Sequence, residues 1–222
     1  MVEKNVGEGL PRLLETIKSY LVAGNKEGVV DGVRIFLSGG GDPQRVLSEA
    51  LIPGMSEIGQ KMAAKEIFIP EVLVSALAMQ AALQIVRPLL NANQVISKGT
   101  VVLGTVKGDV HDIGKNLVSY MLEGAGFQLF DLGISVSPEQ FVDAVNKYHP
   151  QVIGMSAMLT TTMVEMSSVI SALEKAGVRG QVKVIVGGAP VNREFALQIG
   201  ADGYAEEAGG AILEVEKLLA NG

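Results

Sequence analysis

Several residue types are absent or scarce in this chain of 222 residues, and each shortage excludes a kind of site. There is no cysteine, which excludes disulfides, thiolate nucleophiles and cysteine-rich zinc or iron–sulfur centres. There are only two histidines, so we do not expect a metal held mainly by protein nitrogen or sulfur. Tryptophan is absent and aromatic residues make up 5 % of the chain, which argues against a surface that stacks nucleic-acid bases.

Basic clusters and long apolar runs are missing as well. The 18 Lys and Arg residues are outnumbered by 24 Asp and Glu residues, and no positively charged block suggests nucleic-acid binding. No apolar run reaches membrane-spanning length, and the N-terminus carries charges where a signal peptide needs an apolar core. We therefore expect a soluble, cytoplasmic protein that has neither nucleic acid nor a membrane as a partner.

Residues 1–90 show helical spacing and no convincing strand, and we expect them to form a four-helix bundle. The four helices should cover residues 9–25, 26–41, 43–66 and 70–90. Pro53 should break or kink the third helix, because proline has no backbone N–H and crowds the preceding turn. In the fourth helix the spacing predicts one shared face of Leu73, Ala76, Leu77, Gln80, Leu83 and Val86.

The polar stretch 91–99, "NANQVISKG", reads as a linker to a second domain at 100–222. There, Val- and Ile-rich strands alternate with helices, which predicts a parallel sheet covered on both faces. The predicted strands are 100–106, 127–133, 151–157, 182–188 and 202–205, and the predicted helices lie near 113–124, 137–148, 161–176, 192–199 and 207–220. Length and right-handed crossovers favour the flavodoxin-like, Rossmann-like order 2-1-3-4-5. Ligands should then bind beyond the carboxyl ends of strands 1 and 3.

An unusual stretch, "GDVHDIGKN" at 108–116, follows the first predicted strand and so falls at this edge. Asp109 is placed to accept a hydrogen bond from one imidazole nitrogen of His111, which would make the other nitrogen a better ligand. Gly114 leaves room for a bulky ligand near the backbone. The hydroxyls of Ser156, Thr160, Thr161 and Thr162 should face the same crevice, and Gly187 and Gly188 leave space at the end of strand 4. One basic nitrogen beside a glycine-lined slot suits a single axial bond to a metal that is held by its own macrocycle.

Plainer explanations exist for each of these features. A loop histidine is commonly just solvated, and His149 is assigned to ordinary surface. A Gly–Gly pair that ends a strand is usually a turn, and a threonine run is more often a helix cap than a ligand contact. Binding of a mononucleotide has no support, because the sequence contains neither a G-x-G-x-x-G nor a P-loop pattern.

Three separated elements resemble the D-x-H-x-x-G, S-x-L and G-G pattern of cobalamin-binding domains: Asp109-x-His111-x-x-Gly114, Ser156-x-Met158 and Gly187–Gly188. The segment "GMSEIGQKMAAKEIFIPEVLVSALAM" resembles the helical cap of cobalamin-dependent methionine synthase and of small corrinoid proteins of anaerobic methyltransferase systems. The resemblance covers the chain from about residue 10 to the C-terminus. Met158 stands where the pattern has leucine, an apolar exchange of similar volume.

The resemblance implies a cobalamin or related corrinoid bound base-off and His-on, with the cofactor's own base displaced and His111 as the lower axial ligand of cobalt. It makes Asp109 and Thr162 a relay behind His111, and Met62 and Ile69 the apolar cap over cobalt. The remaining cofactor contacts that it implies are Gly108, Val110, Asp112, Ile113, Gly114, Ser156, Met158, Leu159, Thr160, Gly187, Gly188, Tyr204, Ala205 and Glu206.

The function that the resemblance implies is a methyl carrier, a component of a methyltransferase system more than a complete enzyme. The chain would take a methyl group from a substrate:corrinoid methyltransferase of O-demethylase, methylamine, methanol or betaine type. A second methyltransferase would pass it to tetrahydrofolate or coenzyme M, and a reductive activation protein would be a further partner. Two alternatives remain: a cobalamin-dependent regulator or light sensor, and the small subunit of an adenosylcobalamin mutase. The regulator would need a DNA-binding module, and the mutase subunit usually lacks the helical cap.

Overall fold

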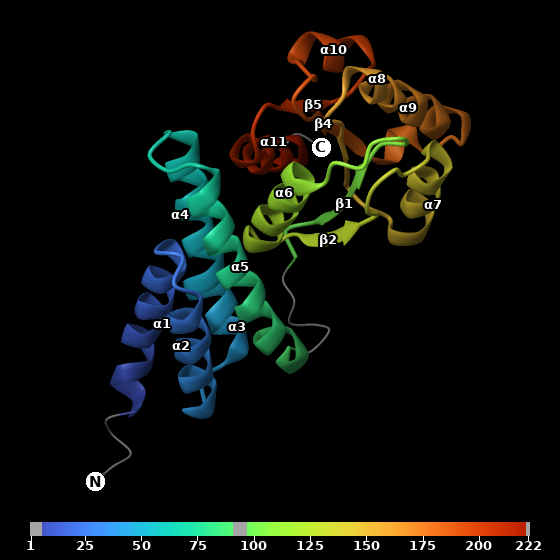
Figure 1. The fold of residues 1–222 in the computed structure, drawn as a ribbon. Coiled ribbons are helices and arrows are strands. Elements are labelled where there is room, and N and C mark those ends of the chain that lie inside the picture. The colour runs from blue at the N-terminus through green and yellow to red at the C-terminus, as the bar shows by residue number, and fades with distance from the viewer. Residues whose placement is uncertain (1–5, 91–96, 221–222) are drawn as a thin grey trace. The chain divides into compact units, whose positions relative to one another are not determined.

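The computed structural model describes residues 6–90 and 97–220, and its main division into two compact units lies between residues 96 and 97 (Figure 1). This division falls inside the predicted linker 91–99, of which residues 91–96 lie outside the described part of the chain.

In the described residues 6–90 of the first unit, all regular secondary structure is helical. Its elements are α1 (Val6–Val22), α2 (Lys26–Ser38), α3 (Pro43–Arg45), the π-helical turn η1 (Val46–Leu51), α4 (Ile52–Ala63), α5 (Ile69–Val86) and the 3-10 turn η2 (Arg87–Leu89). Helix α1 packs against α2, η1 and α4, while α2 packs against α5. Ile17, Val33 and Phe36 are fully buried in the core of this unit. The helical N-terminal region predicted from the spacing is therefore confirmed.

Pro53 disturbs the third predicted helix without ending it. The elements α3, η1 and α4 follow one another without a gap, and Pro53 lies in the first turn of α4. The Ile52 N–H donates to the carbonyl of Leu47, five residues back, as in a π-helix. This wider turn removes the proline ring from the carbonyl that it would otherwise crowd.

Helix α5 differs from the amphipathic helix predicted for it. Leu73 and Leu77, which the prediction placed on the shared face, are 38 % and 42 % exposed. Its buried residues are Val72, Ser75, Ala76, Ala78, Met79, Ala82, Leu83 and Val86. Of the six predicted residues, Ala76, Leu83 and Val86 are thus buried as expected, while Leu73 and Leu77 are exposed. The helix is apolar on all sides, so spacing alone cannot select the buried face.

The apolar composition of α5 also corrects the expectation that no apolar run reaches membrane-spanning length. In the described part of the chain, one stretch, Ile69–Leu89, is long and apolar enough by length and composition. Such a stretch is weak support for a membrane span, because a core helix passes the same test and 44 % of its most apolar window is buried.

The second unit is a five-stranded parallel sheet with helices on both faces. Its elements are β1 (Thr100–Thr105), α6 (Ile113–Gly124), β2 (Gln128–Asp131), α7 (Pro138–Tyr148), β3 (Val152–Ser156), α8 (Thr160–Met163), α9 (Glu165–Lys175), η3 (Arg179–Gln181), β4 (Lys183–Gly187), α10 (Arg193–Gln198), β5 (Gly203–Ala205) and α11 (Ala208–Ala220). The strand order β2-β1-β3-β4-β5 confirms the predicted topology. The predicted helix 161–176 is divided, with Val164 between α8 and α9.

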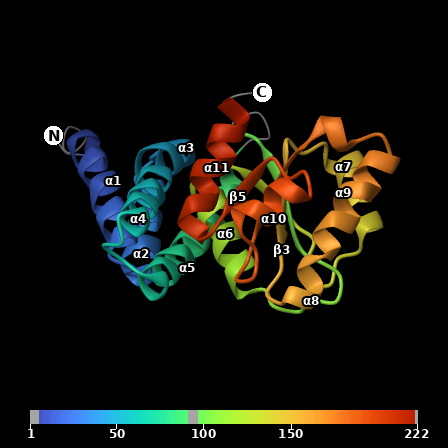
Figure 2. The same cartoon turned by 90° about the horizontal axis from the view of Figure 1, so that it is seen from above.

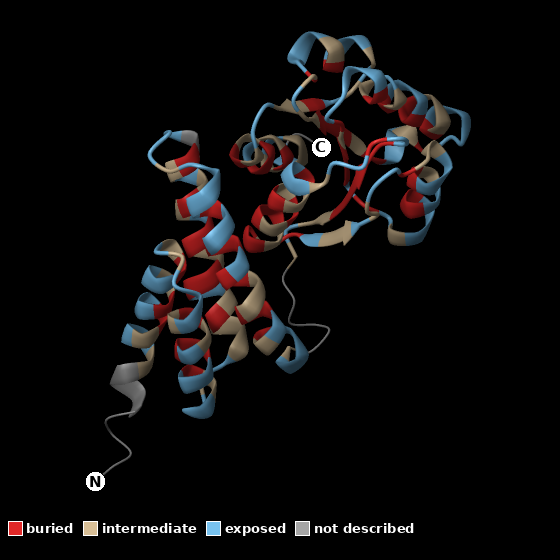
Figure 3. Ribbon diagram, viewed as in Figure 1, coloured by how far each residue is buried: buried red, intermediate tan, exposed pale blue. Residues whose placement is uncertain are grey.

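Alternate residues of the strands face opposite helical layers. Val102, Ile153 and Val184 belong to one core cluster with Phe141 of α7 and Val169 of α9. In Figure 2, α6 and α11 lie on the other face of the sheet from α7 and α9. Figure 3 shows buried residues running along the strands, as expected for a parallel sheet covered on both faces.

Candidate functional site

The carboxyl ends of four neighbouring strands form one row across the sheet. Thr105 pairs with Ser156, Ser156 with Gly187, and Gly187 with Ala205. Three of these four are predicted site residues, and the loops that leave the row carry most of the others. The parallel topology thus brings together residues that lie far apart in the sequence.

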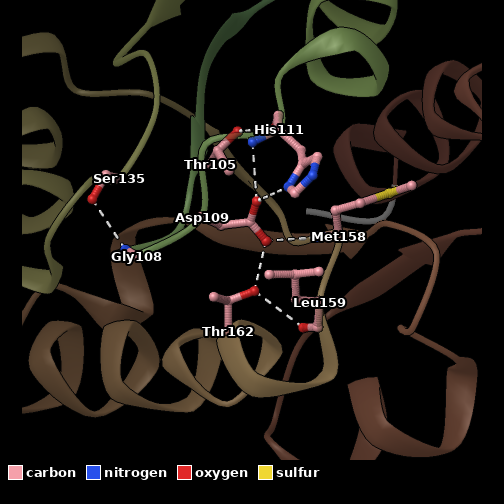
Figure 4. A network of polar contacts seen from close by, with 8 residues as sticks. All are labelled: Thr105, Gly108, Asp109, His111, Ser135, Met158, Leu159 and Thr162. Carbon is pink, nitrogen blue, oxygen red and sulfur yellow. Dashed lines mark hydrogen bonds and ion pairs between the residues drawn. The ribbon is translucent and has the colours of Figure 1, made fainter.

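Asp109 is the centre of the polar network at this edge (Figure 4). It is 0 % exposed, yet its carboxylate accepts several hydrogen bonds. Oδ2 accepts from the Thr162 hydroxyl at 2.6 Å and from the Met158 backbone N–H at 2.7 Å. Oδ1 accepts from the His111 backbone N–H at 3.0 Å and lies 2.8 Å from Nδ1 of the same residue. One buried carboxylate therefore ties the β1–α6 loop to the β3–α8 loop.

These contacts set the charge of Asp109. Burial by itself would raise the pKa of this carboxyl group. The hydrogen bonds from Thr162, from the backbone of Met158 and from His111 outweigh burial and hold the pKa well below its ordinary value. Asp109 is therefore an anion at neutral pH, and it favours a proton on Nδ1 of His111.

His111 lies in the loop before α6, with half of its side chain exposed. Because Nδ1 is engaged by Asp109, Nε2 is the ring nitrogen that remains for an outside ligand or metal. This arrangement of carboxylate, imidazole and open nitrogen is the one by which proteins orient a histidine that ligates a metal. Among the described residues, no group of three or more His, Asp or Glu could hold a metal ion.

Large apolar side chains are exposed around His111. Val110 and Ile113 flank it in the sequence and are 63 % and 77 % exposed. Met158 and Leu159 in the β3–α8 loop are 50 % and 43 % exposed. Ile134, whose neighbour Ser135 donates its N–H to the carbonyl of Asp109, is 46 % exposed and was missed by sequence reasoning. Exposed apolar groups gathered around one polar side chain are typical of a site that a ligand covers.

The surroundings of the glycines that were predicted to leave room for a ligand differ from one glycine to another. A Cβ on Gly188, where φ is +122°, would lie 1.8 Å from the carbonyl oxygen of Ala157, and a Cβ on Gly187 would lie 2.8 Å from that of Ala205. Close backbone packing therefore explains both glycines without a ligand. At Gly114, by contrast, an added Cβ would meet nothing within 4 Å. Of these three glycines, Gly114 alone leaves open space around an added Cβ.

Other predicted residues have their partners inside the α/β unit. The carboxylate of Asp112 accepts a hydrogen bond from Asn116 one turn later in α6, at 3.0 Å. Burial, followed by the charge of Glu206, raises the pKa of Tyr204. The guanidinium of Arg193, which was not predicted, lies 5.9 Å from the ring centre of Tyr204.

Gly108 and Thr160 are exposed, while Ser156 and Ala205 are half-buried at the strand ends.

A buried lysine, Lys115, was also missed by sequence reasoning. Its ammonium donates to Asp131 at 2.5 Å and to Asn116 at 2.7 Å. This lysine lies in the "GKN" part of the stretch that sequence reasoning singled out, but nothing in the sequence indicates that it is buried.

The two cap residues predicted in the helical unit differ from each other. Met62 is 5 % exposed, whereas Ile69 is 54 % exposed. Phe68, which precedes Ile69, is 66 % exposed and was not predicted. The aromatic residue just before the start of α5 was the signal available for it.

Comparison with known proteins identifies the family. The B12 binding domain matches residues 99–213, and a second domain of the same description matches residues 13–87. The chain is 38 % identical to trimethylamine corrinoid protein 2 of Methanosarcina mazei over 95 % of its own length and 98 % of that protein. It is also 38 % identical to dimethylamine corrinoid protein 1 of Methanosarcina acetivorans over 94 % of its length and 98 % of that protein.

The chain belongs to the B12-binding corrinoid protein family.

Solved structures agree with this family. A chain of the methanol:cobalamin methyltransferase complex MtaBC of Methanosarcina barkeri matches with a TM-score of 0.85 and 32 % identity, over 95 % of this chain and 81 % of that one. A cobalamin-binding protein of Desulfitobacterium hafniense matches with a TM-score of 0.73 and 29 % identity, over 92 % and 98 % of the two chains.

A corrinoid fits the residues at the sheet edge. Its macrocycle supplies cobalt with its equatorial ligands, so one free imidazole nitrogen is enough from the protein. The exposed apolar side chains around His111 suit a large ring placed against them, and the open space at Gly114 allows close approach. The residues at this edge are therefore compatible in chemistry and space with a corrinoid.

Proposed function

We propose that this corrinoid protein carries a methyl group from a substrate-specific methyltransferase to a second methyltransferase, which passes it to tetrahydrofolate or coenzyme M. When bound, the corrinoid supplies a cobalt centre that can accept and release a methyl group. Relatives over nearly the whole chain are named trimethylamine and dimethylamine corrinoid proteins, which favours a methylamine as the donor. The MtaBC complex supports a methyltransferase as a direct partner. A reductive activation protein is a further proposed partner, and the cytoplasm is the proposed location.

The observation that carries this proposal is the chain of contacts from Thr162 through Asp109 to His111. His111 would bind cobalt through Nε2 from below, with the cofactor's own base displaced. Asp109 holds the proton on Nδ1, and Thr162 holds Asp109 in place. This relay fixes both the orientation and the tautomer of the imidazole.

The remaining residues would bind and shield the cofactor. The tail would enter beside Ser156, Gly187 and Gly188, with Tyr204, Ala205 and Glu206 on the far side of the slot. In the helical unit, Met62 and Ile69 would form the apolar cover; Ile69 and the neighbouring Phe68 have exposed apolar surface available for this, whereas Met62 is buried. Such a cover must move aside for each methyltransferase.

Corrinoid binding and methyl transfer test the proposal together. Titration with hydroxocobalamin, followed by absorbance and mass spectrometry, should give one corrinoid per chain at micromolar concentrations. After reduction, the loaded chain should take an isotope-labelled methyl group from trimethylamine or dimethylamine when a methylamine methyltransferase is added. It should then release the label to coenzyme M or tetrahydrofolate with a second methyltransferase. Absence of bound corrinoid, or binding without methyl uptake from a methylamine, methanol, a betaine or a methoxylated aromatic, would refute the carrier function.

Loading the chain with methylcobalamin or with adenosylcobalamin tests the two alternative functions, the mutase subunit and the regulator or light sensor, against the methyl carrier. Preferential retention of adenosylcobalamin would indicate a mutase subunit, and a light-dependent change in assembly would indicate a sensor. No observation in the described part of the chain favours either one.

A further inference from the structure

We infer that Thr105 is a positioning residue for His111, because its hydroxyl holds the main chain of the residue that would bind cobalt. The inference rests on the proposed axial role of His111. Its basis is a hydrogen bond of 3.0 Å from the Thr105 hydroxyl to the backbone carbonyl of His111 (Figure 4).

Thr105 is itself firmly fixed. It is the last residue of strand β1, which lies between β2 and β3 in the sheet, and it is 0 % exposed. Its N–H donates to the carbonyl of Gly133 at 3.0 Å, and its carbonyl accepts from the N–H of Val136 at 2.9 Å. A threonine hydroxyl buried without a partner would be costly, so the bond to His111 accounts for a hydroxyl at this position.

His111 is thereby held from two sides. Asp109 binds its backbone N–H and its ring, while Thr105 binds its carbonyl. Thr105 therefore restrains the carbonyl side of His111, which the bonds from Asp109 do not reach. A ligand whose supporting groups are fixed in advance coordinates more tightly than a mobile one.

Ser135 supports the same loop from the β2–α7 connection. Its N–H donates to the carbonyl of Asp109 at 2.9 Å, and its hydroxyl accepts from the N–H of Gly108 at 3.0 Å. It adopts a left-handed backbone with φ of 50°, which is unfavourable for serine unless other contacts hold it. Because Ser135 is exposed, we expect its contribution to be smaller than that of Thr105.

Cyanide titration of the cobalamin-loaded full chain tests the inference. The second cyanide displaces the lower axial nitrogen from cobalt(III), so its midpoint measures how firmly His111 is held. Thr105→Val keeps the shape and removes the hydroxyl, and the midpoint should fall about fivefold, which is the value of one ordinary hydrogen bond. Thr105→Ser restores the hydroxyl and should stay within about twofold of the wild-type chain. Ser135→Ala should lie between them.

Thr16→Val is the matched control. It removes a hydroxyl-to-carbonyl bond of 2.9 Å within α1 of the helical unit, and its midpoint should equal that of the wild-type chain. Amide hydrogen exchange of the corrinoid-free chain gives an independent measurement, in which His111 should exchange faster in Thr105→Val than in Thr105→Ser.

The possible failures can be told apart. A wild-type chain without an axial protein nitrogen would overturn the proposed function and this inference with it. An axial nitrogen in the wild-type chain, with the same midpoint in Thr105→Val, would overturn this inference alone. An equal fall in Thr16→Val would also overturn it, because the effect would then not be local.

Discussion

The helical unit and the α/β unit keep their polar side chains in different places. In the helical unit the ion pairs lie at the surface, as in Glu57 with Lys18 and Lys61, and Ser75 is the one buried polar side chain among its described residues. In the α/β unit the buried polar residues are Thr105, Asp109, Lys115, Ser119 and Thr162. Three of these, Thr105, Asp109 and Thr162, belong to the network around His111. Burial of polar groups is costly unless their partners are fixed, so such a network marks the place where precise geometry matters.

The largest loss of stability should follow when a side chain is added where two backbone segments pack closely at the carboxyl ends of the strands. In Gly188→Ala the added Cβ meets the carbonyl oxygen of Ala157 in a left-handed conformation, and we expect a loss of about 4 kcal/mol in the free energy of unfolding. Gly177→Ala is the control, because φ there is +72° but nothing lies within 4 Å of the added Cβ. It should cost about 1 kcal/mol in chemical denaturation. Equal losses in the two variants would show that the close contact between Gly188 and Ala157 does not determine the cost of the substitution.

Removal of the central carboxylate should have the next largest effect. Asp109→Ala leaves the Thr162 hydroxyl and the N–H groups of Met158 and His111 without their acceptor, so we expect a loss of about 3 kcal/mol. Asp143→Ala, at an exposed position of α7, should change the free energy of unfolding by less than about 0.5 kcal/mol. Urea denaturation of the corrinoid-free chain measures both, and a small loss in Asp109→Ala would contradict a network that depends on this residue.

Gly114→Ala separates binding from stability. The added Cβ meets no protein atom within 4 Å, and alanine favours helix α6, so stability should stay equal or rise by about 0.5 kcal/mol. Corrinoid affinity should fall at least about tenfold if the cofactor passes through this space. Gly210→Ala in α11 has the same open surroundings and should leave affinity unchanged. Unchanged affinity in Gly114→Ala would show that the open space is not used.

The smallest effect should come from the helical unit. Hydrogen bonding to Lys61, and then to Lys18, lowers the pKa of Glu57, but these side chains are about one-third exposed. Glu57→Gln should therefore cost only about 0.5 kcal/mol near neutral pH. Because the folded-state pKa is lowered, this contribution is present above the ordinary pKa of about 4.3 and is lost as the pH falls through the folded value. A large loss of unfolding free energy in Glu57→Gln at neutral pH would contradict the view that polar contacts of the helical unit contribute little to stability.

The sequence predicted the α/β unit well for physical reasons. Buried parallel strands read as Val- and Ile-rich runs, and the resulting order places Asp109, His111 and Thr162 at one edge. The structure brings these three into contact, while their roles toward a cofactor remain predictions. Helix α5 could not be read in this way, because a helix that is apolar on all sides gives no signal of its buried face.

Other contacts could not be predicted because they depend on tertiary structure. Thr105 ends a strand like many threonines, and only the folded loop shows its bond to His111. Ser135 comes from the loop after β2 and reaches Gly108, far away in the sequence. Gly187 and Gly188 suggested an open slot, but neighbouring carbonyls already account for them.

Paramagnetic resonance of the chain loaded with cobalt(II) corrinoid is the most direct test of His111 as the lower axial ligand. The wild-type chain should show nitrogen hyperfine splitting that changes when the protein, and not the cofactor, is labelled with nitrogen-15. His111→Ala should lose this protein-derived splitting and keep most of its corrinoid affinity, because the proposed tail slot is untouched. Splitting that does not respond to protein labelling, or that persists in His111→Ala, would show that another group holds cobalt.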